Sequence, residues 1–184
     1  MPNCGDHTIA RVDLETGAIT AAVPTAIGHS EGSIATGAGS VWMMTDAKGT
    51  LARFDPATNA VVAEIYVAPG SYGLAFGEDA VWVTSTDRGT VARVDPHTNL
   101  IVETIAVGKA PRFIAVGAGA VWTLNQGDGS VSRIDPATNA MVQQFYGKGG
   151  DAVRVGLGSV WLSNLEAGKV WRLDPRRIEA TLPN

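Results

Sequence analysis

The chain has 184 residues, of which 45% are hydrophobic and 17% are charged, a composition that fits a packed globular protein and excludes intrinsic disorder. Its formal net charge of −4 gives no global attraction to nucleic acid or to an acidic membrane, so we expect neither as a partner.

The N-terminal residues lead directly into a strand-like run and lack the shape of a signal peptide. No apolar stretch approaches the roughly 18 residues that a membrane-spanning helix needs. Cys4 is the single cysteine, which excludes an internal disulfide and a cysteine-based zinc site. The chain therefore reads as a soluble protein, and these features do not fix its compartment.

Two sequence markers recur along the chain at a nearly constant spacing. The first is a Val-Trp pair, with Trp residues 40, 40 and 39 positions apart at Trp42, Trp82, Trp122 and Trp161. The second is an Arg-x-Asp triplet, which ends at Asp13, Asp55, Asp95, Asp135 and Asp174. Because two independent markers keep the same phase, we infer an internal repeat of about forty residues.

Each repeat contains four strand-like runs, which we name A, B, C and D. In the copy that spans 73–107 the runs are 73–76, 80–84, 90–94 and 100–105. Glycines and an Asp-Pro turn separate them, and such short connections require antiparallel pairing. In the C–D turn Pro96 fixes φ, Asp95 can accept a backbone hydrogen bond, and Asn99 tolerates a left-handed conformation.

Tandem four-stranded units of this length predict an all-β fold, a β-propeller of antiparallel blades. We expect one domain over 1–184, with an N-terminal half blade followed by four complete blades. The half blade is 1–24 and the full blades are 25–67, 68–107, 108–146 and 147–184. The half blade supplies C near 8–12 and D near 19–23, and the last D run falls near 178–182. The tryptophans should pack between blades, and the Arg-x-Asp triplets should form structural hydrogen bonds.

A chain that opens inside a blade has no A and B strands left over to close a ring by strand exchange. Three outcomes follow: a segment of a longer ring, a closed ring of four blades with the first hairpin appended, or an open arc that associates with a second copy. We favour the first for the gene product. We also expect this chain to self-associate, because an open arc exposes an apolar blade face and strand edges.

The stretches 117–122 (Gly-Ala-Gly-Ala-Val-Trp) and 130–139 (Ser-Val-Ser-Arg-Ile-Asp-Pro-Ala-Thr-Asn) resemble the repeats of a large bacterial propeller superfamily. It groups YVTN-type repeats with virginiamycin B lyase-like propellers, and the resemblance covers essentially the whole chain. It implies the propeller fold. Members include a lyase that opens streptogramin B antibiotics with a bound magnesium ion, and others look like accessory or sensor-type domains, so the fold does not fix the function. Similar propellers are often extracytoplasmic.

The D–A and B–C loops of a propeller gather at one end of its channel, which is the default ligand site. Counting from each Trp places one column of D–A loop residues at Gly32, Tyr72, Arg112 and Asp151. The residue type at this repeat position differs from blade to blade, whereas the scaffold positions keep theirs. This difference fits a binding surface to which each blade contributes a different side chain, and it equally fits unselected loop variation. We predict that His29, Glu31, Tyr72, Arg112 and Asp151 bind a small molecule, a peptide or a partner protein.

The leading functional hypothesis is a non-catalytic scaffold that binds a ligand or partner at the channel mouth. One alternative is a magnesium-dependent lyase of the virginiamycin B type, and another is a propeller segment used only for self-assembly. The resemblance to the lyase implies a catalytic His in a Pro-His-Gly element of a D–A loop. The matching column has no histidine, and His29 lies three positions before it. We therefore predict no catalytic residue, no metal ligand and no cofactor, with magnesium expected only under the lyase alternative.

Overall fold

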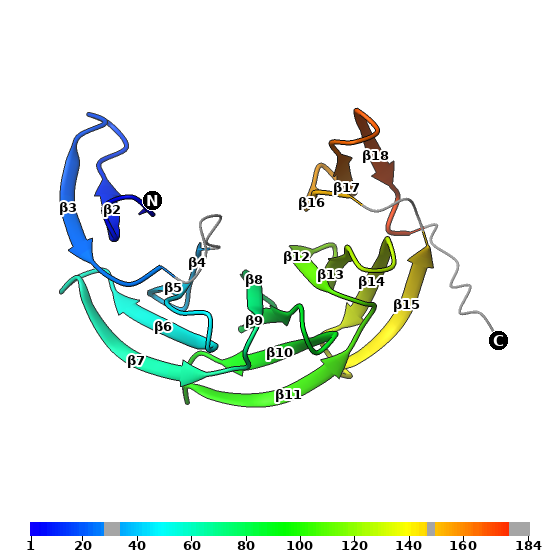
Figure 1. Ribbon diagram of the computed structural model, residues 1–184, viewed down its shortest axis with the longest axis horizontal. Coiled ribbons are helices and arrows are strands. Elements are labelled where there is room, and N and C mark those ends of the chain that lie inside the picture. Colours follow the sequence, from blue (N-terminus) through cyan, green and yellow to red (C-terminus); the bar gives the residue numbers. More distant parts are fainter. Residues whose placement is uncertain (28–33, 147–149, 177–184) are drawn as a thin grey trace.

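The computed structural model describes residues 1–27, 34–146 and 150–176, and every regular element in them is a β-strand. These strands form five antiparallel sheets (Figure 1). The first sheet contains β1 (Pro2–Asn3), β2 (Thr8–Val12) and β3 (Ile19–Pro24). The second contains β4 (Ile34–Gly37), β5 (Ser40–Met44), β6 (Thr50–Asp55) and β7 (Ala60–Tyr66).

The remaining three sheets repeat the same order of strands. The third contains β8 (Ser71–Gly77), β9 (Ala80–Ser85), β10 (Thr90–Asp95) and β11 (Leu100–Ala106). The fourth contains β12 (Pro111–Gly117), β13 (Ala120–Asn125), β14 (Ser130–Asp135) and β15 (Ala140–Tyr146). The fifth contains β16 (Ala152–Gly156), β17 (Ser159–Asn164) and β18 (Lys169–Leu173). The expected all-β fold of blade-like sheets is confirmed, and the D run expected near 178–182 lies outside the described residues.

The C–D turns have the backbone geometry that their sequence predicts. Asn59, Asn99 and Asn139 adopt φ values of 57°, 59° and 56°, the left-handed region that asparagine tolerates. The Asp95 carboxylate accepts a hydrogen bond from the backbone N–H of His97 at 2.7 Å. That hydrogen bond is the main reason that the pKa of Asp95 lies below its usual value.

The tryptophan of each interior blade is buried against the blade that follows. Trp42, Trp82 and Trp122 are each 0% exposed. Trp82 lies in one apolar cluster with Ile114, Val121 and Ile134 of the next blade. Trp161, in the last described sheet, is only half-buried because no described blade covers it. The tryptophans therefore form the inter-blade core, as their periodicity predicts.

In three of the repeats the arginine of the second marker joins neighbouring blades through hydrogen bonds. Arg93 donates from Nη1 to the carbonyl of Pro136 at 2.7 Å and to Oδ1 of Asn139 at 2.6 Å. Its guanidinium also lies 5.2 Å from the centre of the Trp82 ring, a cation–π distance. Arg53 repeats this arrangement with the next blade, and Arg11 donates to the carbonyl of Pro56. The expected structural role of the triplet is confirmed.

Over the described residues the five sheets stack into an open arc and do not close a ring (Figure 1). The first strands of the blades lie on the concave side, and β3, β7, β11 and β15 lie on the convex side. The alternative of a closed four-blade ring is therefore wrong for this structure. The described residues also contain no helix that is long and apolar enough to cross a membrane.

Candidate functional site

The D–A and B–C loops lie together at one end of the blades. Val67 donates its backbone N–H to the carbonyl of Gly49 at 2.8 Å, and Val107 donates to Gly89 at 2.9 Å. At the next junction Gln126 donates its backbone N–H to Ala110 at 3.0 Å. This is the end where the sequence predicts a ligand site.

Tyr72 and Arg112, two of the five predicted site residues, contact each other across adjacent blades. Arg112 donates from Nη2 to the hydroxyl of Tyr72 at 2.9 Å. The guanidinium lies 4.3 Å from the centre of the Tyr72 ring, so a cation–π contact adds to the hydrogen bond. The ring of Phe113 meets Tyr72 edge to face, with 6.2 Å between centroids. These three side chains form an aromatic and cationic cluster at the mouth.

Gln126 extends this cluster toward the last described sheet. Arg112 donates from Nη1 to Oε1 of Gln126 at 3.5 Å, the upper limit for such a bond. Gln126 in turn donates from Nε2 to the carbonyl of Gly150 at 3.0 Å. A polar row therefore links β8, β12 and the segment before β16.

Asp151 has a different environment from Tyr72 and Arg112. Its backbone N–H donates to Ser163 at 2.7 Å, and its carboxylate accepts a hydrogen bond from the backbone N–H of Leu165. The side chain thus caps the B–C loop of its own blade. His29 and Glu31, the other two predicted residues, lie outside the described residues.

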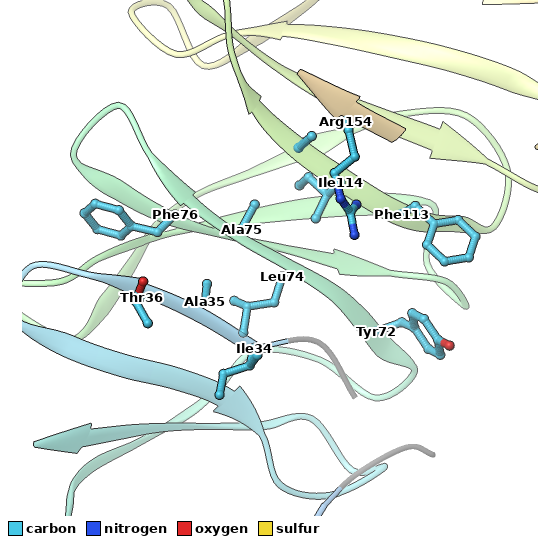
Figure 2. A pocket seen from close by; sticks show the side chains of 11 residues that line it. Ile34, Ala35, Thr36, Tyr72, Leu74, Ala75, Phe76, Phe113, Ile114 and Arg154 are labelled. Carbon is cyan, nitrogen blue, oxygen red and sulfur yellow. The ribbon is translucent and has the colours of Figure 1, made fainter. Parts of the chain in front are cut away.

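A groove of about 530 Å³ lies beside this cluster on the concave face (Figure 2). Most of the residues that line it have apolar side chains and come from β4, β8 and β12, but more of the exposed lining is polar than apolar. The lining residues include Ile34, Leu74, Phe76, Phe113 and Ile114, with Tyr72 at one side. A volume of this size is in the range of small-molecule sites, which are mostly apolar clefts with a few polar groups.

Arg154 on β16 brings a positive charge to the groove. Figure 2 shows its side chain extending toward Ile114 of β12. The side chain is exposed, and Nη1 donates to the carbonyl of Val153 at 2.7 Å. Among the eleven lining residues, Arg154 alone carries a formal charge at neutral pH. The groove thus combines several apolar side chains with one cation.

The groove was not predicted, because the prediction placed the ligand site on the loops, whereas the A strands form the groove. A signal was present: the repeat places Ala35, Ala75, Ala115 and Arg154 at one position of the A strand. Three alanines keep the concave face open, and the fourth blade departs from them with a long cationic side chain.

Two aspartates at this end of the blades, Asp46 and Asp128, stabilise the loops by accepting hydrogen bonds from backbone N–H groups. Asp46 accepts hydrogen bonds from the backbone N–H groups of Gly49 and Thr50, and the bond from Thr50 is the main cause of its lowered pKa. Burial acts to raise the pKa of Asp128, but hydrogen bonds led by the backbone N–H of Lys109 outweigh it and the pKa is lowered. Both groups therefore favour the ionised form that caps their loops.

The described residues do not fit a magnesium site of the kind that the lyase alternative requires. Magnesium prefers oxygen ligands that converge with near-octahedral geometry. Within 1–27, 34–146 and 150–176 no three acidic, histidine or cysteine side chains come together in a way that could hold a metal ion. Asp46, Asp128 and Asp151 each direct an oxygen to backbone N–H groups.

No family model matches the chain, and no curated protein sequence matches it. Solved structures do match. Virginiamycin B lyase from Staphylococcus aureus superposes with a TM-score of 0.76 at 18% identity, covering 92% of this chain and 59% of that one. A streptogramin B lyase structure gives 0.73 at 17% identity, covering 96% and 64%.

Proteins of other kinds share the same architecture. Hydrazine synthase from Kuenenia stuttgartiensis gives a TM-score of 0.68 at 17% identity, over 77% of this chain and 45% of that one. The computationally designed Ika4 protein gives 0.64 at 19% identity, over 81% of this chain and 96% of its own. The chain spans 45% of the hydrazine synthase chain and 59% and 64% of the two lyase chains, less than two thirds in each case. The fold is therefore that of a β-propeller, which is the fold that the resemblance seen in the sequence implies.

Proposed function

We propose that this chain is a non-catalytic β-propeller module that binds an apolar ligand or peptide side chain bearing a negative charge. The observation that carries the proposal is the concave groove with Arg154 extending into it from an otherwise alanine position. The apolar side chains in the groove favour contact with an apolar part of the ligand, and the guanidinium favours a carboxylate, sulfonate or phosphate group.

The cluster at the mouth supports this assignment. Tyr72 and Phe113 offer aromatic edges beside the groove, and Arg112 holds the Tyr72 ring through its hydrogen bond and cation–π contact. Residues locked in this way lose little entropy when a ligand binds. We expect the mouth to orient the ligand and Arg154 to select its charge.

A test uses 1-anilinonaphthalene-8-sulfonate, an aromatic sulfonate whose fluorescence rises when it leaves water. Arg154→Ala should weaken its binding about tenfold, the equivalent of ~1.4 kcal/mol, and Tyr72→Ala should also weaken it. Lys169→Ala is the matched control, because Lys169 is an exposed cation of the same sheet that does not line the groove. If neither Arg154→Ala nor Tyr72→Ala changed the affinity for the dye, the proposal would be overturned.

The likeness to virginiamycin B lyase favours one second candidate, the opening of a streptogramin B with magnesium. A catalytically inactive form of that lyase has been solved with quinupristin, and it superposes on this chain with a TM-score of 0.74. Incubating this protein with quinupristin and Mg²⁺, followed by chromatography and fragmentation of the product, separates the two. A linear isomer would establish the lyase and overturn the non-catalytic proposal, whereas recovery of intact quinupristin would support it.

A further inference from the structure

The last described sheet exposes a face that every interior blade buries. In the interior blades the matching position of the C strand holds Leu51, Val91 and Val131, with exposures of 0%, 0% and 4%. In the last sheet it holds Val170, which is 67% exposed. Trp161 beside it is only half-buried, although its three counterparts are fully buried. This face (Trp161, Val170 and Arg172), which we call the C-terminal face, has the composition of a blade junction without the second blade.

Within its own blade Arg172 is arranged as Arg53 is. Its Nε donates to the hydroxyl of Ser159 at 2.8 Å, as the Nε of Arg53 donates to Ser40 at 2.8 Å. Its guanidinium lies 5.6 Å from the centre of the Trp161 ring. In Arg53 the remaining Nη1 reaches the turn carbonyl of the next blade, whereas Arg172 is exposed. The C-terminal face therefore presents a pre-positioned donor for a C–D turn.

The N-terminal sheet presents a C–D turn that no described arginine reaches. Its turn runs from Asp13 to Gly17, and by the repeat the Leu14 carbonyl matches that of Pro56, the acceptor of Arg11. Leu14 is 97% exposed. The turn also carries Glu15, an extra acid that the turns after Asp55, Asp95 and Asp135 lack.

The charges of the two ends are complementary. Lys169 and Arg172 lie on the last sheet, whereas Asp13 and Glu15 lie on the first turn, and all four side chains are exposed or half-buried. Hydrogen bonds, chiefly from the backbone N–H of Thr16, lower the pKa of Asp13 and keep it ionised. Opposite charges at two ends of one molecule favour contact between one copy and the next and disfavour contact between like ends.

We infer that two copies of this chain join head to tail, with the C-terminal face of one copy docked on the N-terminal sheet of the next and Arg172 donating to its Leu14 carbonyl. Such an interface is heterologous, so it forms a ring where the arcs close and a filament where they do not. The inference does not depend on the groove, and it concerns a different surface.

Light scattering after size exclusion tests the inference, because one chain has a mass of 19.1 kDa. The unaltered chain should give a multiple of this mass. Val170→Glu places a charge in the junction and should weaken association at least about tenfold. Glu15→Arg sets two like charges against each other and should have a similar effect. Val62→Glu is the matched control, because Val62 is 54% exposed on β7 of the convex side.

Mixing the two variants makes the test specific for head-to-tail docking. The Val170→Glu chain keeps an intact N-terminal sheet, and the Glu15→Arg chain keeps an intact C-terminal face. A 1:1 mixture should therefore form a species of two chains that neither variant forms alone. A 19.1 kDa monomer of the unaltered chain at ~100 µM, a concentration that reveals even weak docking, overturns the inference. Variants that associate normally, or a mixture that stays monomeric, overturn it as well.

Discussion

At the scale of single residues, arginines at the blade junctions stabilise the fold although they are not fully buried. Arg93 is half-buried, yet it makes two hydrogen bonds to the next blade and a cation–π contact within its own. Arg133 differs from Arg93, because its guanidinium donates to Gln143 of its own blade at 3.0 Å. At the sequence position of the Asn139 that accepts from Arg93, the last repeat has Ile178, which offers no side-chain acceptor.

We predict that Arg93→Ala lowers the free energy of unfolding by about 2–3 kcal/mol, since charged hydrogen bonds and a partly desolvated cation–π contact are lost together. Arg93→Lys should recover only part of this, because an ammonium cannot reproduce the planar fork. Arg88→Ala, an exposed arginine of the neighbouring B–C loop, should change stability by less than ~0.5 kcal/mol. Urea unfolding measures all three. Equal effects at Arg93 and Arg88 would contradict the role of the junction.

The site residues show what spacing can and cannot predict. Tyr72 and Arg112 are 40 positions apart, and stacked blades bring such positions together, so the sequence places them in one column and the structure confirms their contact. Asp151 shares that column, but a main-chain donor on its own B–C loop, Leu165, determines the direction of its carboxylate. Spacing predicts which side chains lie near one another, whereas local hydrogen-bond donors decide where each one points.

At the scale of strands and sheets, burial of the tryptophan depends on the presence of the next blade. Trp82 is 0% exposed and Trp161 is half-buried, although both donate from the indole N–H to a glycine carbonyl five residues earlier. Removing a fully buried aromatic costs about 3–5 kcal/mol. We predict a loss of that size for Trp82→Ala and a clearly smaller one for Trp161→Ala, in thermal unfolding at a concentration where the chain is monomeric. Equal losses would mean that something else covers Trp161.

Turn chemistry explains why the strands were predictable to within a few residues. The expected C run 90–94 is observed as β10 (Thr90–Asp95), because left-handed turn residues, Gly89 before it and Asn99 after it, limit its extent. Each described C–D pair also contains one register shift, after Arg11, Arg53, Arg93 or Arg133. The sequence did not predict this bulge, since it arises from pairing between strands and has no residue signature of its own.

At the scale of the whole molecule, an arc of stacked sheets has neighbours on both sides only in its middle. Each blade contacts the adjacent ones, so stability in such a protein is approximately a sum of blade and junction contributions. The blades that contain β9 and β13 have junctions on both sides, whereas the sheets that contain β2 and β17 each have one. The ends should therefore open at a lower free energy than the middle.

Amide hydrogen exchange at neutral pH measures this gradient blade by blade. We predict that the amides of β9 and β13 exchange last and that those of β2 and β17 exchange at least about tenfold faster, since a missing junction worth ~1.4 kcal/mol already gives that factor. The Val170→Glu chain provides the monomeric reference, and exchange in β17 of the unaltered chain should slow when its concentration rises if the ends dock. Uniform exchange across all sheets of the monomer would show instead that the arc opens as one cooperative unit, and the picture of independent junctions would then be wrong.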